Sequence, residues 1–341
     1  MGAPVNVAEL WRGPILESLH QGHAVIADSS GDLVAVWGNA GMVMLPRSAC
    51  KMLQALPLVE SGAAARFGLG DRQLALACAS HQGAPVHAGA VRAWLGHIGR
   101  RVDDLICGPQ APRDTHDLAA LARSGVQAGR HHNNCSGKHA GFLTLERHLG
   151  GGAGYGATDH PVQRAVRAAF EDMTGTESPG HAIDGCSAPN FATTLAGLAR
   201  AMAQMAAPER LSKEQGATRG AAAAKLVGAM MAHPELVAGE GRACTGLTRA
   251  LAGAGVVKTG AEGVFTAILP KRGLGVALKV TDGATRAAEC AMAAILVRLG
   301  AAAETHPEVA CRLRAEQRNW DGLPVGRLVP AEAFWQGGAA I

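Results

Sequence analysis

Segments with β-strand character at both ends of the chain enclose a long helical middle, and this order constrains the fold more than any other feature. Two β-rich runs within residues 23–37 flank a turn of Asp, Ser and Gly residues and predict a hairpin. Residues 263–269 and 274–281 have period two on either side of Pro270 and Gly273, and they predict a second hairpin. Parallel βαβ units would have to recur along the whole chain in a Rossmann fold, so the order predicts an α+β fold.

The middle of the chain, about residues 64–252, is dominated by helical patterns. A separate helix is expected from Arg47 until Pro57 kinks or ends it, whereas the stretch 319–341 is too irregular to assign. We expect a single domain, residues 1–341, in which an antiparallel sheet from both ends packs with helices. The other helices are expected over residues 88–98, 116–122, 137–148, 161–173, 193–205, 220–231 and 285–299.

Composition excludes several classes of protein. The 341 residues are 48% hydrophobic and 18% charged, which predicts a sizeable core rather than disorder or a coiled coil. The net charge of +4 is spread without basic runs, so we expect no nucleic-acid partner. No window reads as a membrane span, residues 1–24 lack a secretory apolar region, and eight scattered cysteines form no CxxC pair. We therefore expect a cytoplasmic protein with reduced thiols and no membrane partner.

Ser48 and Lys51 form the sharpest local motif. A spacing of three residues on a helix puts the hydroxyl and the amine on one face, so that Lys51 can deprotonate Ser48. Only a neutral lysine acts as a base, so its pKa must fall below the usual ~10.4 through burial or a neighbouring cation. The motif alone also fits an ordinary helix face, and it therefore needs support from a second cation.

Lys258, in the sequence Lys258-Thr-Gly260, supplies that cation just before the C-terminal hairpin. A Ser-x-x-Lys helix followed by a Lys-Thr-Gly strand resembles the layout of serine β-lactamases and penicillin-binding proteins, although their Ser-Asp-Asn triplet is missing. Tyr155 is the only tyrosine and lies in a glycine loop, which makes it a poor candidate base. Ser80 is the natural further hydroxyl, with Lys258 as its partner, unless it is a helix or turn cap.

Cys135 and Cys186 lie in polar, turn-like segments and form a second candidate site. Two thiolates that converge from separate loops bind a soft or borderline cation such as Zn²⁺, although a closed structural site normally has four ligands. The candidates for a further ligand are His139, His131, Asp184 and Lys138. Chemistry alone favours histidine, because lysine binds a metal only when deprotonated. The alternative is two buried free cysteines beside functional loops.

Seven ordered segments cover most of the chain. They are Arg47-Ser-Ala-Cys-Lys51, Ala79-Ser-His81, Asn134-Cys-Ser-Gly-Lys-His139, His160-Pro-Val-Gln163, Asp184-Gly-Cys186, His233-Pro-Glu-Leu-Val-Ala-Gly-Glu-Gly-Arg242 and Lys258-x-Gly260. Together they resemble the class 3, rhizobial-type L-asparaginases, a family distinct from the threonine-dependent asparaginases. That family is similar in fold to serine β-lactamases and glutaminases, which is the fold that the two lysine motifs indicate.

The resemblance implies two Ser-Lys tandems in one pocket, Ser48 with Lys51 and Ser80 with Lys258. It also implies that Cys135, Lys138 and Cys186 hold zinc, with Lys138 as a neutral amine, against the expectation of a histidine ligand. The zinc would be structural and would orient substrate rather than generate the nucleophile. The expected substrate-binding residues are Arg47, Asn134, His139 and Asp184. Met52 departs from the family, because related sequences often have proline at this position. The resemblance also implies a homodimer.

We therefore expect hydrolysis of L-asparagine to L-aspartate and ammonia through an acyl-enzyme on Ser48, with Lys51 as the base. Backbone N–H groups beside Ser48 and one on the Lys258 strand are expected to stabilise the oxyanion. Ser80 with Lys258 would transfer the proton to ammonia and activate water. The alternatives are a β-lactamase- or peptidase-like serine acyl enzyme and a non-catalytic protein on the same fold that binds an amino acid or zinc.

Overall fold

A computed structural model describes residues 2–338, and the chain divides into two compact units. Unit 1 combines Met1–Ala49, Thr193–Ala207 and Gly246–Ile341. Unit 2 combines Cys50–Ala192 and Pro208–Thr245. The single domain expected over residues 1–341 stays a prediction.

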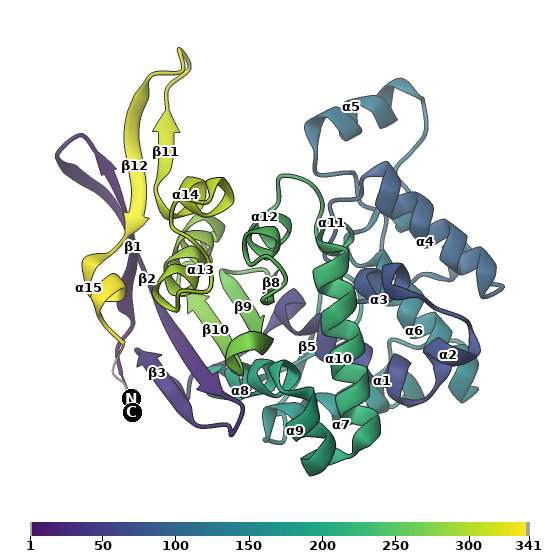
Figure 1. Cartoon of the computed structure of the whole chain (residues 1–341). Helices are drawn as coiled ribbons and strands as arrows, with labels where there is room; N and C mark the ends of the chain where they lie inside the picture. The colour runs from purple at the N-terminus through teal and green to yellow at the C-terminus, as the bar shows by residue number, and fades with distance from the viewer. Residues whose placement is uncertain (1, 339–341) are drawn as a thin grey trace. The chain divides into compact units, whose positions relative to one another are not determined.

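Within the described residues, unit 1 is built on an eight-stranded antiparallel sheet (Figure 1). The strand order is β11-β12-β1-β2-β10-β9-β8, and β3 also pairs with β2. Strands from both ends of the chain share this sheet, which confirms the predicted α+β class and the predicted antiparallel sheet. The strands are β1 (Val5–Arg12), β2 (Ile15–Asp28), β3 (Leu33–Trp37), β8 (Val256–Thr259), β9 (Val264–Leu269), β10 (Leu274–Val280), β11 (Ala315–Arg318) and β12 (Pro324–Pro330).

Helices of unit 1 pack on this sheet. Helix α8 contacts β2, β9 and β10, and α13 contacts β1, β9, β10 and β12. Gly275 of β10 allows the close approach of α8, because a Cβ there would lie 2.1 Å from the backbone nitrogen of Ala203. The helices are α8 (Leu195–Ala206), α13 (Thr285–Arg298), α14 (Pro307–Leu313), α15 (Glu332–Gln336) and the 3₁₀ helix η4 (Pro270–Arg272). A short pair, β4 (Val43–Met44) with β7 (Thr193–Thr194), completes the unit.

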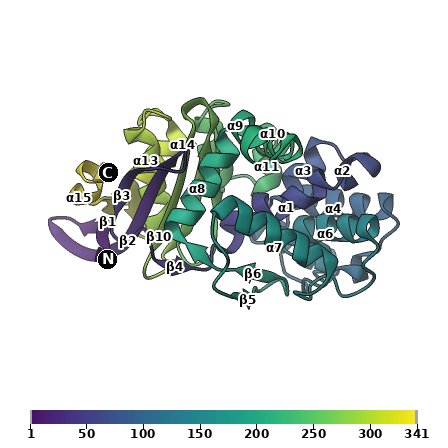
Figure 2. The same ribbon diagram turned by 90° about the horizontal axis from the view of Figure 1, so that it is seen from below.

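Unit 2 is mainly helical (Figure 2), and its helix α1 is buried over most of its length. Helices α6, α7 and α10 pack against α1, and α3 packs against α6 and α10. A small hairpin joins β5 (His181–Ile183) to β6 (Pro189–Phe191). The helices are α1 (Lys51–Glu60), α2 (Ala63–Arg66), α3 (Asp71–Ala77), α4 (Pro85–His97), α5 (Thr115–Arg123), α6 (Ser136–Leu149), α7 (Pro161–Thr174), α9 (Pro208–Gln215), α10 (Ala217–Ala232), α11 (Pro234–Val237), and the 3₁₀ helices η2 (Val102–Asp104) and η3 (Arg130–His132).

Two elements run from one unit into the other, namely η1 (Arg47–Cys50) and α12 (Ala243–Ala250). The expected helix from Arg47 to Pro57 is therefore corrected: a 3₁₀ turn comes first, and α1 then continues through Pro57 to Glu60. Proline removes one backbone donor from the helix, and the burial of residues 51–58 offsets that loss.

The other expected elements are present, with ends that differ by a few residues. The stretch that the sequence left unassigned contains β12, which pairs with β1, and α15. Residues 339–341 of that stretch lie outside the described residues. None of the eight cysteines forms a disulfide within the described residues.

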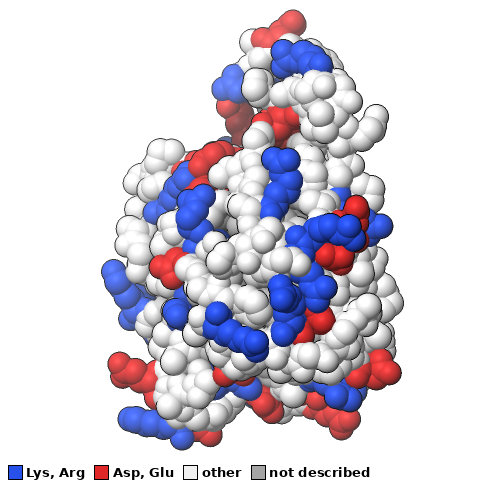
Figure 3. Space-filling model, turned by 90° about the vertical axis from the view of Figure 1, so that its right-hand side faces the viewer, with Lys and Arg blue, Asp and Glu red and all other residues white. Residues whose placement is uncertain are grey.

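Within residues 2–338, every helix is too short or too polar to span a membrane. Figure 3 shows one face of the molecule, on which basic and acidic side chains are interspersed. The charge distribution on this face agrees with the low net charge of the sequence.

Candidate active site

Unit 1 places the segment that carries Ser48 beside the strand that carries Lys258. Ser48 lies on η1, and Lys258 lies on β8 with 1% of its surface exposed. Thr266 pairs with Lys258 in the β8–β9 ladder. Its Oγ1 lies 3.1 Å from the carbonyl oxygen of Ala49 and 3.2 Å from that of Lys258. The buried hydroxyl of Thr266 therefore contacts both candidate catalytic segments.

The backbone before Ser48 is strained. Arg47 has a φ of 51°, in the left-handed region that non-glycine residues seldom adopt, at a cost of about 1–3 kcal/mol. A Cβ at Gly260 would lie 2.7 Å from the carbonyl oxygen of Pro46, so the end of β8 packs directly on this segment. Such strain is concentrated at functional sites. Nothing in the sequence around Arg47 signals it.

Unit 2 contributes the second lysine-hydroxyl contact. Lys51 is the first residue of α1 and is 1% exposed. Its Nζ lies 2.5 Å from the carbonyl oxygen of Ala79, 2.9 Å from Ser80 Oγ and 3.1 Å from Cys135 Sγ. Three partners match the three N–H donors of a lysine ammonium. Lys51 is therefore a partner of Ser80 and also a neighbour of the Cys135 thiol.

The contact between Lys51 and Ser80 was not predicted, because it joins residues 29 positions apart. The sequence paired Lys51 with Ser48, and it paired Ser80 with Lys258. Ser48 and Lys258 belong to unit 1, whereas Lys51 and Ser80 belong to unit 2. Both predicted tandems stay predictions.

Backbone hydrogen bonds hold the segment around Ser80, which follows α3. Ser80 N donates to the carbonyl oxygen of Val237 at 2.9 Å, and Gln82 N donates to that of Ala238 at 2.9 Å. His81 N donates to the carbonyl oxygen of Asn134 at 3.1 Å. The main chain of Ser80 is thus fixed on both sides, and its hydroxyl bonds to Lys51 rather than capping a helix.

The predicted metal-binding residues converge within unit 2. Cys135 is the N-cap residue of α6, and Lys138 and His139 lie in the first turn of that helix. Lys138 Nζ donates to Cys186 Sγ at 3.1 Å, and the thiols of Cys135 and Cys186 hydrogen-bond to each other. The side chains of Cys135, Lys138, His139 and Cys186 are all buried. We call Cys135, Lys138 and Cys186 the thiol cluster.

A tight turn presents Cys186 to this cluster. Asp184 N donates to the carbonyl oxygen of Ala188 at 2.9 Å, and Ser187, with a φ of 66°, donates its N–H to that of Asp184 at 2.8 Å. Asp184 Oδ1 accepts the N–H of Gly185 at 2.7 Å. The predicted substrate-binding residues Asn134, His139 and Asp184 therefore lie in unit 2, and Arg47 lies in unit 1.

The cluster is electrostatically asymmetric. The hydrogen bond from Cys135 and the charge of Lys138 lower the pKa of Cys186, although burial opposes them. The hydrogen bond with Cys186, together with burial, raises the pKa of Cys135. Burial alone would lower the pKa of Lys138, but Cys186 and Cys135 together raise it. Between the two thiols, the negative charge is therefore favoured on Cys186 rather than on Cys135.

The donor set of this cluster fits a zinc ion. Zinc is bound by sulfur and nitrogen, and two thiols with one amine supply three such ligands and leave a fourth position open. The two thiols and the amine therefore suit a cation that would come from outside the chain.

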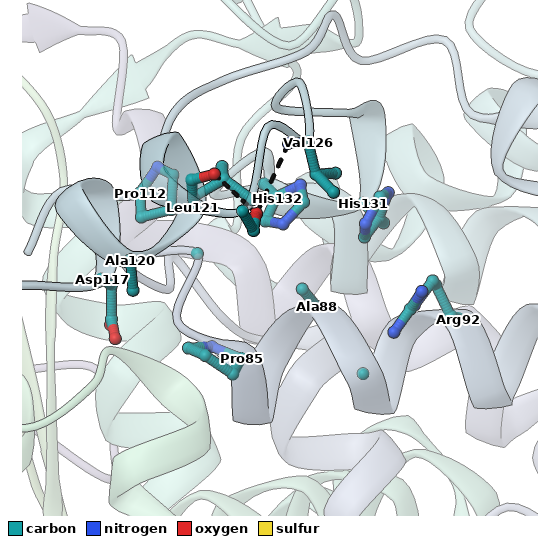
Figure 4. A pocket seen from close by; sticks show the side chains of 13 residues that line it. Pro85, Ala88, Arg92, Pro112, Asp117, Ala120, Leu121, Val126, His131 and His132 are labelled. Carbon is teal, nitrogen blue, oxygen red and sulfur yellow. Dashed lines mark hydrogen bonds between the residues drawn. The ribbon is translucent and has the colours of Figure 1, made fainter.

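Unit 2 also contains a cavity of about 330 Å³ between α4, α5 and η3 (Figure 4). Arg92, His131 and His132 line it together with apolar side chains, among them Leu121 and Val126. Of the candidate metal ligands named from the sequence, the lining described here includes only His131, and it includes none of the predicted catalytic residues. The 3₁₀ helix η3, which lines the cavity, leads into the segment of Asn134 and Cys135.

Comparison with known proteins gives one family match. A family model described as L-asparaginase II matches residues 8–330. No curated protein matches the chain.

Several solved structures are similar at low identity. The protein titled Mglu, in its glutamate form, is 15% identical with a TM-score of 0.44; the match covers 82% of this chain and 61% of that one. A putative β-lactamase from Bacteroides dorei is 12% identical with a TM-score of 0.42; the match covers 76% of this chain and 84% of that one. A β-lactamase from Mycobacterium bovis is 12% identical with a TM-score of 0.34, over 81% of this chain and 94% of that one. The chain thus spans less than two thirds of the Mglu chain.

Proposed function

We propose that this chain, which belongs to the L-asparaginase II family and is therefore an amide hydrolase, hydrolyses L-asparagine to L-aspartate and ammonia. The observation that supports a serine mechanism best is the buried Lys51 Nζ, 2.9 Å from Ser80 Oγ. A hydroxyl hydrogen-bonded to an amine is the arrangement of an activated nucleophile or a proton relay. Lys258, equally buried on β8, is the second candidate base.

In the proposed mechanism, Ser48 Oγ attacks the side-chain carbonyl carbon of asparagine, and a neutral Lys51 accepts the serine proton. The tetrahedral intermediate then collapses, the C–N bond breaks, and a proton passes to the departing ammonia. Water attacks the resulting aspartyl ester and releases L-aspartate. Ser80 relays protons with Lys51 and Lys258, and backbone N–H groups beside Ser48 stabilise the oxyanion.

Zinc is proposed as the resident metal of the thiol cluster. Cys135, Lys138 and Cys186 would hold it, with Lys138 bound as the neutral amine. Bound zinc supplies a fixed positive charge that orients the amino-acid end of the substrate, while serine supplies the nucleophile. The substrate-binding residues in this proposal are Arg47, Asn134 and Asp184, with His139 acting on the substrate through the thiol cluster beside it.

The test is release of ammonia from asparagine, glutamine and a simple amide, measured for the parent chain and for Ser48→Ala and Ser80→Ala. We expect each substitution to lower kcat by at least about a thousandfold, because residues that act as one catalytic unit are not additive. Ser178→Ala is the matched control: Ser178 is as buried as Ser80, at 8% exposure, and its hydroxyl donates to backbone carbonyls. Parent activity in both site variants would contradict the serine mechanism.

Mass spectrometry of rapidly quenched enzyme would locate the aspartyl ester. An ester on the peptide that contains Ser48 supports the assignment of the nucleophile. An ester on the peptide that contains Ser80 exchanges the two serine roles and leaves the acyl-enzyme mechanism intact.

We further propose that the protein is a cytoplasmic homodimer. Light scattering of the purified chain would measure its mass in solution. A monomer at working concentration contradicts the dimer. Fractionation of the source cells would test the location.

A further inference from the structure

Tyr155 is buried to 2% exposure and lies beside the thiol cluster, although the sequence marks it only as a poor candidate base. Its hydroxyl accepts the backbone N–H of Ile106 at 2.9 Å. The same hydroxyl lies 2.9 Å from Nδ1 of His139, the neighbour of Lys138 on α6. A single phenol thus joins the main chain to the imidazole.

The direction of the second hydrogen bond follows from counting protons. A phenol has one O–H proton, and the backbone N–H of Ile106 can only donate, so it leaves that proton free for another acceptor. Within the described residues, Nδ1 of His139 is the only acceptor that contacts the Tyr155 hydroxyl. The reverse arrangement would leave a buried O–H without a partner, at a cost of about 1–3 kcal/mol.

This direction fixes the tautomer of His139. The ring is completely buried. Because Nδ1 accepts a hydrogen bond, the ring cannot be an imidazolium, in which both nitrogens carry protons. A neutral imidazole whose Nδ1 accepts a hydrogen bond carries its proton on Nε2. Nε2 is the atom that is buried without a hydrogen-bond partner. His139 therefore presents an N–H donor at Nε2, and the Cys186 sulfur is the neighbouring group with which it interacts.

We propose that Tyr155 is a positioning residue that holds His139 as an Nε2–H donor toward the Cys186 sulfur, so that His139 supports the metal cluster without ligating the metal. A protonated ring nitrogen has no lone pair for a cation. Lys138 is then the nitrogen donor of the cluster, and His139 stabilises the thiolate from outside the ligand set. The metal-binding part of this inference rests on the proposed zinc site, and the tautomer does not.

The first experiment measures the tautomer in the full chain by ¹⁵N NMR of labelled histidines, with the His139 signals assigned from their loss in His139→Gln. We expect Nδ1 without a proton and Nε2 with one. In Tyr155→Phe the Nδ1 signal should move to that of an acceptor without a hydrogen bond. A protonated Nδ1 in the parent chain, or no change in Tyr155→Phe, would overturn the proposal.

Thr144→Val is the matched control for the lost hydroxyl. Thr144 is also buried on α6, accepts the indole N–H of Trp94 at 3.1 Å and donates to Ala140 at 2.8 Å. It should leave the His139 signals unchanged. If Thr144→Val moves them as far as Tyr155→Phe does, then the shift reports general loosening of α6 and the proposal fails.

The second experiment measures zinc affinity without any activity assay. Glutamine at position 139 offers an amide N–H near the place of Nε2, whereas leucine offers none. We expect His139→Gln to stay within about threefold of the parent affinity, and His139→Leu to weaken it by about 10- to 100-fold. Equal affinities of the two variants, whether high or low, would contradict a donor role. If zinc binds neither variant nor the parent chain, the proposed metal site fails while the tautomer result stands.

Discussion

His81, which follows Ser80, should make the fold sensitive to acid. Its ring is completely buried and stacks on His87 with a centroid distance of 4.8 Å. Nδ1 accepts the N–H of Gly83 at 3.2 Å, so Nε2 carries the proton and donates to Ser136 Oγ at 3.0 Å. Burial, and then the charges of His87 and Lys51, hold the pKa of His81 well below its ordinary value. The folded chain therefore keeps this ring neutral in moderate acid.

The size of the effect follows from proton linkage. In the unfolded chain His81 titrates near its ordinary pKa of ~6.5, so above that pH both states are neutral and the group contributes nothing. Below that pH the unfolded chain binds a proton that the folded chain does not bind. The free energy of unfolding then falls by about 1.4 kcal/mol for each pH unit, until the folded pKa is reached. Between pH 7.5 and pH 5.0 the loss from this one group is at most about 2 kcal/mol.

Urea unfolding at pH 7.5 and pH 5.0 measures this loss in the parent chain and in His81→Gln. Glutamine removes the titration from both states, so the variant should lose less stability than the parent between the two pH values, by up to about 2 kcal/mol. Its lost hydrogen bonds lower stability at both pH values and cancel in the difference. His116→Gln, an exposed position on α5, should lose as much as the parent. An equal loss in His81→Gln and the parent would refute the reasoning.

Three further predictions concern catalysis. Ammonia release should rise from neutral to alkaline pH, because the attack on asparagine needs an uncharged lysine; a flat pH profile would count against that base. Removal of the metal with a chelator should raise KM for asparagine more than it lowers kcat, and added zinc should restore KM; an unchanged KM would refute the orienting role. Lys258→Met should lower kcat by at least about 100-fold. The control is Lys279→Met, which should leave kcat unchanged: Lys279 also lies on the sheet, and each of the two lysines donates its Nζ to the carbonyl oxygen of the next residue. Equal effects of the two substitutions would remove Lys258 from the mechanism.

Periodicity predicted the elements whose signal is local. Helices such as α7 and α10 and the hairpin of β9 and β10 follow directly from their sequence patterns, because packing merely selects the face that those patterns already define. Strand β12 has no such signal, since it is held by pairing with β1 at the other end of the chain. Pro57 is tolerated inside α1 because tertiary burial outweighs a local helix breaker.

The chemistry of the candidate site was more predictable than its contacts. The residue types required for a thiol-amine cluster are visible in the sequence, and Cys135, Lys138 and Cys186 do meet. The contact between Lys51 and Ser80 and the left-handed backbone of Arg47 are products of tertiary packing, which no spacing rule encodes. The sequence indicated only that Tyr155 is a poor candidate base, and its contact with His139 is likewise a product of tertiary packing.

The partners of Lys51 also restrict which proton can move. The carbonyl oxygen of Ala79 can only accept a hydrogen bond, and the Cys135 sulfur is at best a weak donor. Ser80 Oγ is the one strong hydrogen-bonding partner that can change from acceptor to donor. It accepts a hydrogen bond from the Lys51 ammonium and can donate one to the neutral amine. A neutral Lys51 in this buried position therefore keeps all of its hydrogen bonds only when Ser80 is present. Ser80→Ala should thus impair the base even when Ser48 is the nucleophile, and Ser80→Thr, which keeps the hydroxyl, should recover most of the lost rate; equal rates for the two variants would show that the hydroxyl plays no part.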